Sequence, residues 1–343
     1  AKLDDRDEDG KAPLMWAAEY NKNPDVITTL LKAGAKPDDR DKDGKTPLMW
    51  AALGNKNPDV ITILLNAGAK IDDRDNKYGE TPLMWAAEYN KNPDVITTLL
   101  RAGAKIDDRN KNGMTPLMFA AWCNENPDVI TTVLNAGAKI NDRDKNGWTP
   151  LMRAAMNNQN PDVITTLLRA GAKIDERDDT KKTPLMYAAE KNENPAVIMT
   201  LLNAGADPTI KSGDGKTALD YAQGNAKLKG TPALKALQDA TLGSSGSTNK
   251  PVAQDIFALA KSGTPEQIQA AINAGAKLDD RDKDGWTPLM WAAGFNGNPE
   301  VITALLNAGA RLDDRDNFGM TPLMNAAAGN QNPDVITTLL RAG

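Results

Sequence analysis

Residues 1–34 read AKLDDRDEDGKAPLMWAAEYNKNPDVITTLLKAG, and this pattern recurs along most of the 343-residue chain. The further copies span residues 35–68, 69–103, 104–137, 138–171, 172–205, 276–309 and 310–343. One copy has 35 residues rather than 34, and its extra residue falls in the stretch 76–79, which we expect to be a tolerant loop tip. Because a unit of this length buries its apolar face only against neighbouring units, the sequence predicts a solenoid rather than two ordinary domains.

Each copy divides into two short helices and a polar turn. The turn glycine, Gly10 in the first copy, suits a left-handed backbone. Thr46 before Pro47 predicts the start of one helix, and Asn23 before Pro24 predicts the start of the second. Apolar residues at helical spacing follow, and a glycine ends the unit. The fold class predicted is therefore all-α: helix, short loop, helix and an extended, hairpin-like turn.

The motif D-x-x-G-x-T-P-L-x-x-A-A in these units resembles the ankyrin repeat, and the resemblance covers nearly the whole chain. It implies an ankyrin-repeat solenoid, of bacterial type or engineered, whose concave groove binds a protein or peptide without catalysing a reaction. The family usually has histidine after T-P-L, whereas the copies here have methionine: Met15, Met49, Met84, Met118, Met152, Met186, Met290 and Met324. A thioether cannot donate a hydrogen bond, so the turn network must be satisfied in another way.

Two atypical units lie in the interior of the chain. The predicted organisation is six repeats in residues 1–205, a C-terminal-type capping repeat in 206–242, a flexible Gly/Ser linker in 243–250, N-terminal-type capping helices in 251–275 and two repeats in 276–343. Solenoids carry their caps at the two ends of the array. We therefore interpret the chain as an engineered circular permutant of an array ordered 251–343 then 1–242, in preference to a native protein with two blocks.

This organisation also predicts an alternative function, in which a designed chain assembles with itself through its uncapped ends. Ten stacked units span about 90 Å, whereas the linker reaches at most about 28 Å, so one chain cannot join its own ends. Residue 343 of one chain would then stack on residue 1 of another, as a closed domain-swapped homodimer rather than an open filament, with a monomer as the outcome that excludes both. The residues expected at this seam are Ala1, Leu3, Leu14, Leu339, Leu340 and Gly343.

The composition disfavours other classes of function. The chain has no histidine and a single cysteine, Cys123, so His-assisted catalysis, thiolate zinc sites and an intrachain disulfide are excluded. We expect no catalytic, cofactor-binding or metal site, with calcium binding by the acidic turns as a minor alternative. A net charge of −5 disfavours nucleic acid, and no apolar run is long enough to cross a membrane. No targeting segment is recognised, so the compartment is unknown, with the cytoplasm as the default.

Residues that recur in the copies are interpreted as structural. The Asp and Arg residues of the turns predict a self-neutralising ladder between neighbours, and the paired Asn residues, such as Asn21 and Asn23, predict caps and a stacked amide ladder. Two positions depart from the pattern. Ala12 replaces the capping threonine, and Lys181 stands where other turns have glycine, so that turn must differ or be strained.

Positions that vary between copies are the candidates for partner recognition, because large aromatic side chains anchor protein interfaces. They are Trp291, Trp16, Trp50, Trp85, Phe119, Arg153 and Tyr187 directly after the methionine, Trp286 and Trp148 at turn tips, and Tyr20, Tyr89 and Trp122 after the paired alanines. For the first group, packing between helices and contact with a partner remain equally open; for the turn tips we expect exposure. Glutamates on the same face favour a basic or mixed partner segment: Glu19, Glu80, Glu88 and Glu190.

Overall fold

The computed structural model describes residues 3–243, 256–273, 275–330 and 332–343, and the regular structure of these residues is helical, without strands. The first helices of the units are α1 (Pro13–Tyr20), α3 (Pro47–Gly54), α5 (Pro82–Tyr89), α7 (Pro116–Cys123), α9 (Pro150–Asn157), α11 (Pro184–Lys191), α13 (Ala218–Ala222), α15 (Ile256–Ser262), α17 (Pro288–Phe295) and α19 (Pro322–Gly329). The second helices are α2 (Pro24–Lys32), α4 (Pro58–Asn66), α6 (Pro93–Arg101), α8 (Pro127–Asn135), α10 (Pro161–Arg169), α12 (Pro195–Asn203), α14 (Pro232–Gly243), α16 (Pro265–Asn273), α18 (Pro299–Asn307) and α20 (Pro333–Ala342), with a 3₁₀ turn η1 (Ala226–Leu228) before α14.

Capping side chains fix where these short helices begin. In α3, Pro47 follows the cap and Thr46 Oγ1 accepts a hydrogen bond from Met49 N. In α2, Asn23 Oδ1 accepts a hydrogen bond from Asp25 N. Each such cap contributes about 1 kcal/mol. The caps set the helix boundaries, while packing supplies most of the stability, because helices of eight or nine residues are marginal in isolation.

The recurring methionine takes part in the turn network as an acceptor. In α9, Thr149 N donates to Met152 Sδ at 3.5 Å, while Thr149 Oγ1 accepts from Met152 N at 3.3 Å. The same reciprocal pair begins α11 and α17. The sulfur therefore supplies a weak acceptor for the backbone N–H of the threonine, which is how the network is satisfied without a side-chain donor.

Arginine side chains join each turn to the next. Arg40 Nη1 donates to Gly44 O in its own unit at 2.7 Å and to Arg74 O in the next unit at 3.0 Å, and Arg40 Nη2 lies 2.6 Å from Asp73 Oδ1. Equivalent ion pairs are Arg6–Asp39, Arg74–Asp108, Arg109–Asp142, Arg143–Glu176 and Arg281–Asp314. The predicted ladder is confirmed. Because these pairs are partly exposed, each contributes at most about 1 kcal/mol.

A second ladder of buried asparagines links the loops between paired helices. Asn90 Nδ2 donates to Ala52 O at 3.0 Å and to Asn55 O at 2.8 Å, and its Oδ1 accepts from Asn92 N. The pattern recurs at Asn55, Asn124, Asn158, Asn192, Asn296 and Asn330. Each amide satisfies carbonyls of the preceding unit, which confirms the predicted stack.

Turn glycines hold left-handed backbone conformations, as Gly10 does with φ +82°. Lys181 adopts φ +63°, the one positive φ found outside glycine among the described residues. The turn therefore keeps its shape and Lys181 carries the strain, at a cost of about 1 kcal/mol.

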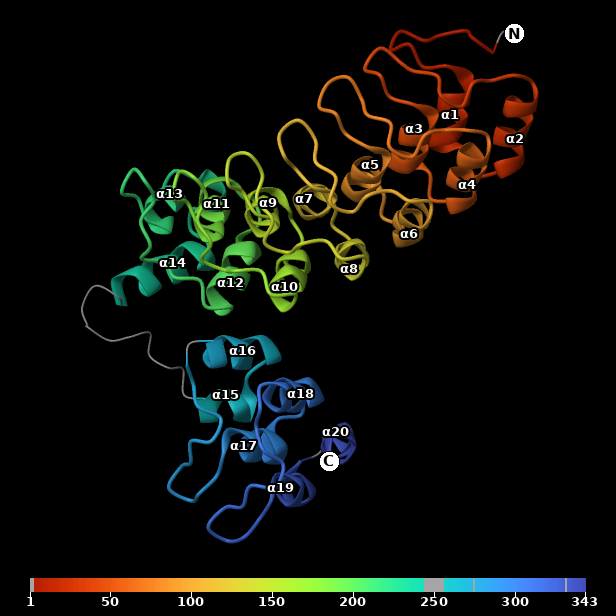
Figure 1. Cartoon of the computed structure of the whole chain (residues 1–343). Coiled ribbons are helices and arrows are strands. Elements are labelled where there is room, and N and C mark those ends of the chain that lie inside the picture. The colour runs from red at the N-terminus through yellow and green to blue at the C-terminus, as the bar shows by residue number, and fades with distance from the viewer. Residues whose placement is uncertain (1–2, 244–255, 274, 331) are drawn as a thin grey trace. The chain divides into compact units, whose positions relative to one another are not determined.

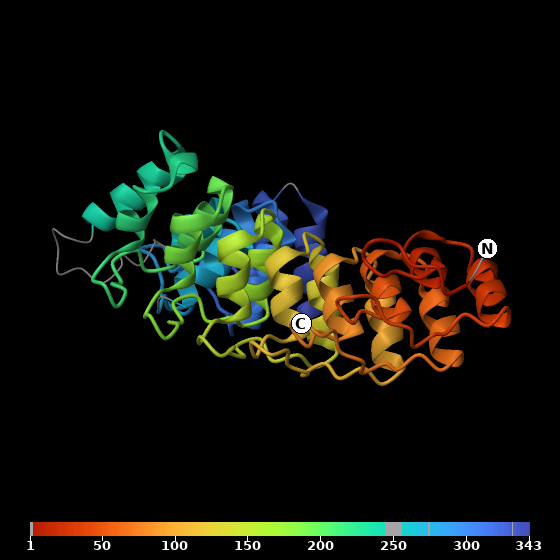
Figure 2. The ribbon, with the colours of Figure 1, turned by 90° about the horizontal axis from the view of Figure 1, so that it is seen from above.

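Successive units pack in two layers. First helices contact first helices from α1 to α13, and second helices contact second helices from α2 to α10 (Figure 1). Figure 2 shows the helix pairs of residues 1–200 following one another in chain order, from red to green. The core between them consists of side chains such as Leu48, Met49, Val60 and Ile61, which are at most 1% exposed.

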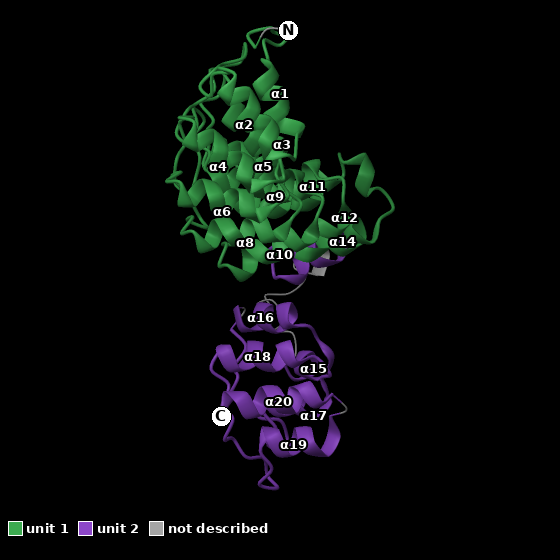
Figure 3. Ribbon diagram, turned by 90° about the vertical axis from the view of Figure 1, so that its right-hand side faces the viewer, with its two compact units in different colours: residues 1–200, 208–237 green, residues 201–207, 238–343 purple. Residues whose placement is uncertain are grey.

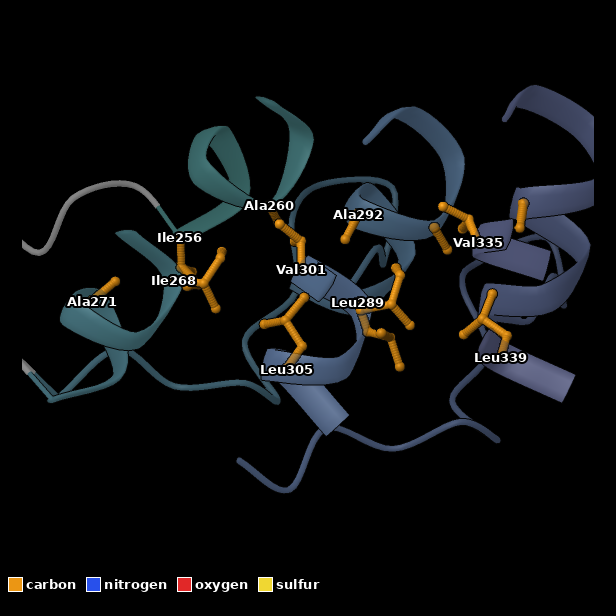
Figure 4. Packing of buried hydrophobic residues seen from close by; sticks show 13 residues of the cluster. Ile256, Ala260, Ile268, Ala271, Leu289, Ala292, Val301, Leu305, Val335 and Leu339 are labelled. Atoms are coloured by element: carbon orange, nitrogen blue, oxygen red, sulfur yellow. The ribbon is translucent and has the colours of Figure 1, made fainter. Parts of the chain in front are cut away.

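The chain forms two compact units, one of residues 1–200 with 208–237 and the other of residues 201–207 with 238–343 (Figure 3). The division runs through the predicted cap 206–242, and α14 extends to the start of the predicted linker; the rest of that linker, 244–250, lies outside the described residues. In the second unit, a buried cluster connects Ile256 and Ile268 with Leu289 and Leu339 (Figure 4).

Candidate protein-binding face

In four of the first six repeats, the residue directly after the methionine is hydrogen-bonded to its own turn. We call these residues of the first unit the aromatic face: Trp16, Trp50, Trp85, Phe119, Arg153 and Tyr187. Trp16 Nε1 donates to Asp7 Oδ2 at 2.9 Å, and Trp50 Nε1 donates to Asp41 Oδ2 at 3.0 Å. The same spacing of nine residues joins Arg153 to Asp144 and Tyr187 to Asp178. This bond was not predicted, although the constant spacing and the N–H or O–H donor shared by Trp, Arg and Tyr indicate it.

Exposure varies strongly along the aromatic face. Trp16 keeps 44% of its surface exposed, Trp50 and Trp85 are half-buried, and Phe119 and Tyr187 are 1% and 5% exposed. Trp122 lies against Phe119, and the turn residue Trp148 lies against Tyr187. Of the two alternatives left open by the sequence, packing therefore accounts for Phe119 and Tyr187, which offer little open contact surface.

Exposed tyrosines extend the aromatic face. Tyr20 stacks on Trp16 with 5.6 Å between ring centroids, and Tyr89 stacks on Trp85 at 5.7 Å. These tyrosines are 62% and 48% exposed. The half-buried Trp122 lies against Phe119. The structure thus brings together predicted residues from α1 and from α5 as two stacked, accessible pairs.

The turn tryptophans are less exposed than predicted. Trp148 is half-buried, and its ring centroid lies 4.2 Å from that of Tyr187. In the second unit, Trp286 is also half-buried and packs beside Trp291 and Phe295. Both turn residues pack against aromatic rings of nearby helices, and this packing partly buries them.

A cavity of about 470 Å³ opens on the first unit beside Tyr187. Its wall includes Trp148, Met156 and Tyr221 together with the ion pair Lys182–Glu190, whose Nζ and Oε2 atoms are 2.7 Å apart. Lys182 Nζ lies 4.3 Å from the Tyr221 ring centroid, so its ammonium occupies part of an aromatic enclosure.

Lysines that follow the turn glycine place their ammonium groups over the rings. Lys11 Nζ lies 4.5 Å from the Trp16 centroid and 3.2 Å from the Trp50 centroid, and it pairs with Glu19 at 3.0 Å. Lys45 Nζ lies between Trp50 and Trp85 in the same way. Cation–π contacts of this kind contribute about 0.5–2 kcal/mol each, according to their exposure.

The repeat of residues 69–103 breaks the pattern. Its extra residue places Trp85 ten positions after Asp75, and both Trp85 Nε1 and Asp75 Oδ2 are buried without a hydrogen-bond partner. Glu80 stands where Lys11 stands in the first repeat. Burial, followed by the charges of Asp75 and Glu88, raises the pKa of Glu80 to about 7, against the hydrogen bond of Asn110 and the charge of Lys45.

Cys123 is not a reactive thiol. Burial, followed by the charge and hydrogen bond of Glu88, raises its pKa to about 12. Burial also raises the pKa of Glu88, against the opposing hydrogen bonds of Tyr89 and Cys123. The cysteine thus serves as a neutral neighbour of a buried carboxyl.

The residues predicted at the self-association seam fall into two groups. Leu340 is 60% exposed, Gly343 is exposed and Leu3 is half-buried. Leu14 and Leu339, at 1% and 3% exposure, are packed within their own units, so their assignment to an open seam is wrong. The predicted Ala1 lies outside the described residues.

Two further observations bear on other classes of site. Among the described residues, no three His, Cys, Asp or Glu side chains are grouped so that they could hold a metal ion. No described helix is both long and apolar enough to cross a bilayer.

Paired helices stacked in this order define an ankyrin-repeat solenoid, and the chain belongs to the ankyrin repeat family. The family model "Ankyrin repeats (3 copies)" matches residues 14–110, 55–144, 89–178, 151–238 and 256–343. Among solved structures, the human ASB11 ankyrin repeat domain is similar, with 26% sequence identity, a TM-score of 0.57 and coverage of 66% of this chain and 97% of that one. None of the curated proteins compared with this chain matches it. Ankyrin repeats generally mediate protein–protein interaction.

Proposed function

We propose that the chain is a non-enzymatic scaffold that binds a protein or peptide in a concave groove along the aromatic face of the first unit. The observation that carries this proposal is the pair of accessible ring stacks, Trp16 with Tyr20 and Trp85 with Tyr89. Their exposed rings offer large apolar contact area, and the Trp16 indole is held by its bond to Asp7. Anchors that are fixed before binding lose little side-chain entropy, which favours affinity.

The proposal is tested with binders that are selected without bias. Peptides that bind the intact chain are selected from a random displayed library, and their affinities are measured against Tyr20→Ala, Tyr89→Ala and, as a matched control, Arg101→Ala on an exposed helix terminus of α6. We expect the tyrosine variants to weaken most binders about tenfold or more, as truncated interface anchors do, and the control to leave them unchanged. Binders that depend on Arg101 and not on the tyrosines would contradict the proposal.

As a second function, we propose self-association of two copies, supported by complementary surfaces on the outermost repeats. In the repeat of residues 310–343, Met324 is 46% and Leu340 is 60% exposed, whereas the equivalent Met15 is fully buried. In the repeat of residues 1–34, Val26 and Leu30 are half-buried, whereas their equivalents Val335 and Leu339 are buried. Side chains that are exposed in one of these repeats are thus more buried at the equivalent positions of the other. This is expected if the two surfaces pack against each other as successive repeats do.

Light scattering tests this association. We expect a concentration-dependent dimer that Met324→Lys converts to a monomer, with Lys235→Met on the exposed part of α14 as a control without effect. A reciprocal, domain-swapped dimer reaches a plateau at two chains, whereas an open filament keeps growing with concentration. A monomer at every concentration would contradict the proposal.

We further propose that the order of the units reflects an engineered rearrangement of one array. The internal position of the predicted caps, 206–242 and 251–275, supports it. A chain in the order 251–343 then 1–242 should be monomeric and have a higher melting temperature than the present chain. In that chain the contact between the repeats of residues 310–343 and 1–34 is intramolecular. An equal or lower melting temperature would contradict the rearrangement.

A further inference from the structure

Two repeats of the first unit hold an ammonium group between rings and beside a glutamate. Lys11 and Glu19 are 7% and 5% exposed, and the ammonium of Lys11 lies over the Trp16 and Trp50 rings. Lys182 and Glu190 repeat this arrangement beside Tyr221. The molecule therefore contains internal examples of how this face binds a cation: a carboxylate supplies the counter-charge and neighbouring rings supply the walls.

The repeat of residues 69–103 has the carboxylates of such a site but not its cation. Glu80 takes the position of Lys11, and Glu88 takes that of Glu19. Both glutamates are buried, at 6% and 7% exposure, and the pKa of Glu80 rises under the charge of Glu88. Where the first repeat buries one positive and one negative group, this repeat buries two acidic groups.

Asp75 adds a third carboxylate to this group. It is 4% exposed, and its charge raises the pKa of Glu80. In the first repeat the equivalent Asp7 and Lys11 both lie at the Trp16 ring, which places the equivalent positions 75 and 80 beside Trp85. Asp75 Oδ1 accepts hydrogen bonds from the backbone of the turn, but Oδ2 has no partner. In the first repeat the equivalent oxygen, Asp7 Oδ2, is paired with the Trp16 indole. The extra residue of the turn thus leaves a buried anionic oxygen beside Glu80 with no donor.

Lys45 of the preceding repeat is the cation that lowers the pKa of Glu80. Its ammonium is already engaged, 3.4 Å from Asp43 Oδ2 and between the Trp50 and Trp85 rings. Burying several carboxyl groups together is costly unless a positive group or hydrogen-bond donors compensate them. Asn110 Nδ2 donates one long hydrogen bond to Glu80 Oε1, at 3.4 Å, and Tyr89 and Cys123 hydrogen-bond to Glu88. Asp75 Oδ2 has no partner, so these donors and one shared lysine leave the compensation incomplete.

We propose that Asp75, Glu80 and Glu88 form a receptor site for a lysine or arginine side chain of the partner. This rests on the proposed function, because it places the site within the aromatic face and gives the partner segment its chemistry. Tyr89, which is 48% exposed and stacked on Trp85, marks where the site meets the surface. The incoming cation lies where the ammonium of Lys11 lies in the first repeat, beyond the end of the shorter Glu80 side chain and beside the Trp85 ring.

The site is tested with small cations on the full chain. N-acetyl-lysine amide and N-acetyl-arginine amide are titrated to about 50 mM while the indole N–H signals of the seven tryptophans are followed by NMR. We expect the Trp85 signal to move in a saturable way with at least one amide, with a dissociation constant on the order of 1 mM to 10 mM, and not with the neutral N-acetyl-citrulline amide. No movement of Trp85, or equal movement with citrulline amide, overturns the proposal.

Three variants localise the response. Glu80→Lys rebuilds the internal cation and should weaken amide binding at least tenfold, and Glu80→Gln should do the same by removing charge without supplying a cation. Glu193→Gln removes an exposed carboxylate from the same unit and should leave binding unchanged. Binding should also weaken from pH 8 to pH 6 in the wild type, because protonated Glu80 no longer attracts a cation. Binding that survives in both Glu80 variants overturns the site.

This outcome is separable from that of the proposed function. If the amides fail to bind but selected peptides still depend on Tyr20 and Tyr89, the aromatic face binds proteins and the acidic receptor site does not exist. If the amides bind but no peptide depends on the tyrosines, the receptor site stands and the scaffold proposal fails.

Discussion

The repeats of residues 1–34 and 69–103 have the same first-helix sequence, PLMWAAEY, yet they bury opposite charges beside it. In the first repeat, Lys11 pairs with Glu19 and the Trp16 indole pairs with Asp7. In the repeat of residues 69–103, which is the third along the chain, Glu80 replaces the lysine and the Trp85 indole has no hydrogen-bond partner. Identical helices therefore become two different surfaces because of one turn residue and one inserted residue. The helices provide the framework, and the turn chemistry determines what the face can bind.

Substitutions in the asparagine ladder should give the largest difference in free energy of unfolding between these two repeats. Asn90→Ala removes two bonds to the preceding unit and one to its own loop, which leaves buried carbonyls unpaired, so we expect it to lower the free energy of unfolding by about 3 kcal/mol. Asn21→Ala removes only the bond that Asn21 Oδ1 accepts from Asn23 N, so we expect a loss of about 1 kcal/mol. Urea unfolding followed by circular dichroism measures both. Equal losses would contradict the role of the ladder between units.

The second contrast is pH dependence in the third repeat. Folding raises the pKa of Glu80 from 4.5 to about 7. The ionisation of Glu80 therefore costs no folding free energy below pH 4.5, and the free energy of unfolding falls as the pH rises from 4.5 through 7. Glu80→Gln should therefore gain stability over the wild type between pH 5 and pH 8, by about 2 kcal/mol. Urea midpoints of the two proteins at these pH values measure the gain. A difference that does not change with pH would contradict the raised pKa.

The third contrast concerns the helix caps. Thr81 Oγ1 accepts from Met84 N, whereas Ala12 offers no side-chain cap. Exchanging the residues should reverse the contrast: Ala12→Thr should add about 1 kcal/mol and Thr81→Ala should remove about the same amount. Thermal melts of the two variants measure these changes, with Ala12→Ser as a second capping substitution that should also stabilise. If both threonine and serine at position 12 are neutral, the cap is not limiting in the first repeat.

The smallest expected effect extends the comparison of turns to the repeat of residues 172–205. Lys181 holds the φ of +63° that glycine adopts in the other turns. Lys181→Gly should relieve this strain and raise stability by about 0.5–1 kcal/mol, after the greater backbone freedom of glycine in the unfolded chain is subtracted. Lys181→Ala keeps the strain and serves as the control. A glycine variant no more stable than the alanine variant would contradict the strain at this position.

Sequence predicted the framework well because its determinants are local and repeated. Thr46-Pro47 and Asn23-Pro24 mark helix starts through side chains that act within three residues, and the structure begins helices there. The ladders were predictable because each repeated residue meets its own equivalent in the next unit. The bond of Trp16 to Asp7 could also have been predicted, through its spacing of nine residues. It is missing at Trp85, where a residue is inserted, at Phe119, which has no donor, and at Asn325, whose buried Nδ2 has no partner.

The burial of individual rings was not predictable in the same way. Trp16 and Phe119 occupy equivalent positions, but they are 44% and 1% exposed because exposure depends on the side chains of both neighbouring units. The exposure of the residues predicted at the self-association seam could not be predicted from the sequence either. Leu14 and Leu340 are both apolar residues of outermost repeats, and only the stacking direction determines that the first is covered and the second is open.

The most direct test of the missing cation in the third repeat is the urea unfolding of Glu80→Lys at pH 8. The substitution places beside Glu88 the ammonium that Lys11 places beside Glu19, so it should replace uncompensated acidic groups by an ion pair. We predict a free energy of unfolding about 2 kcal/mol above that of the wild type. A variant with unchanged or lower stability would contradict the uncompensated charge at Glu80 and Glu88.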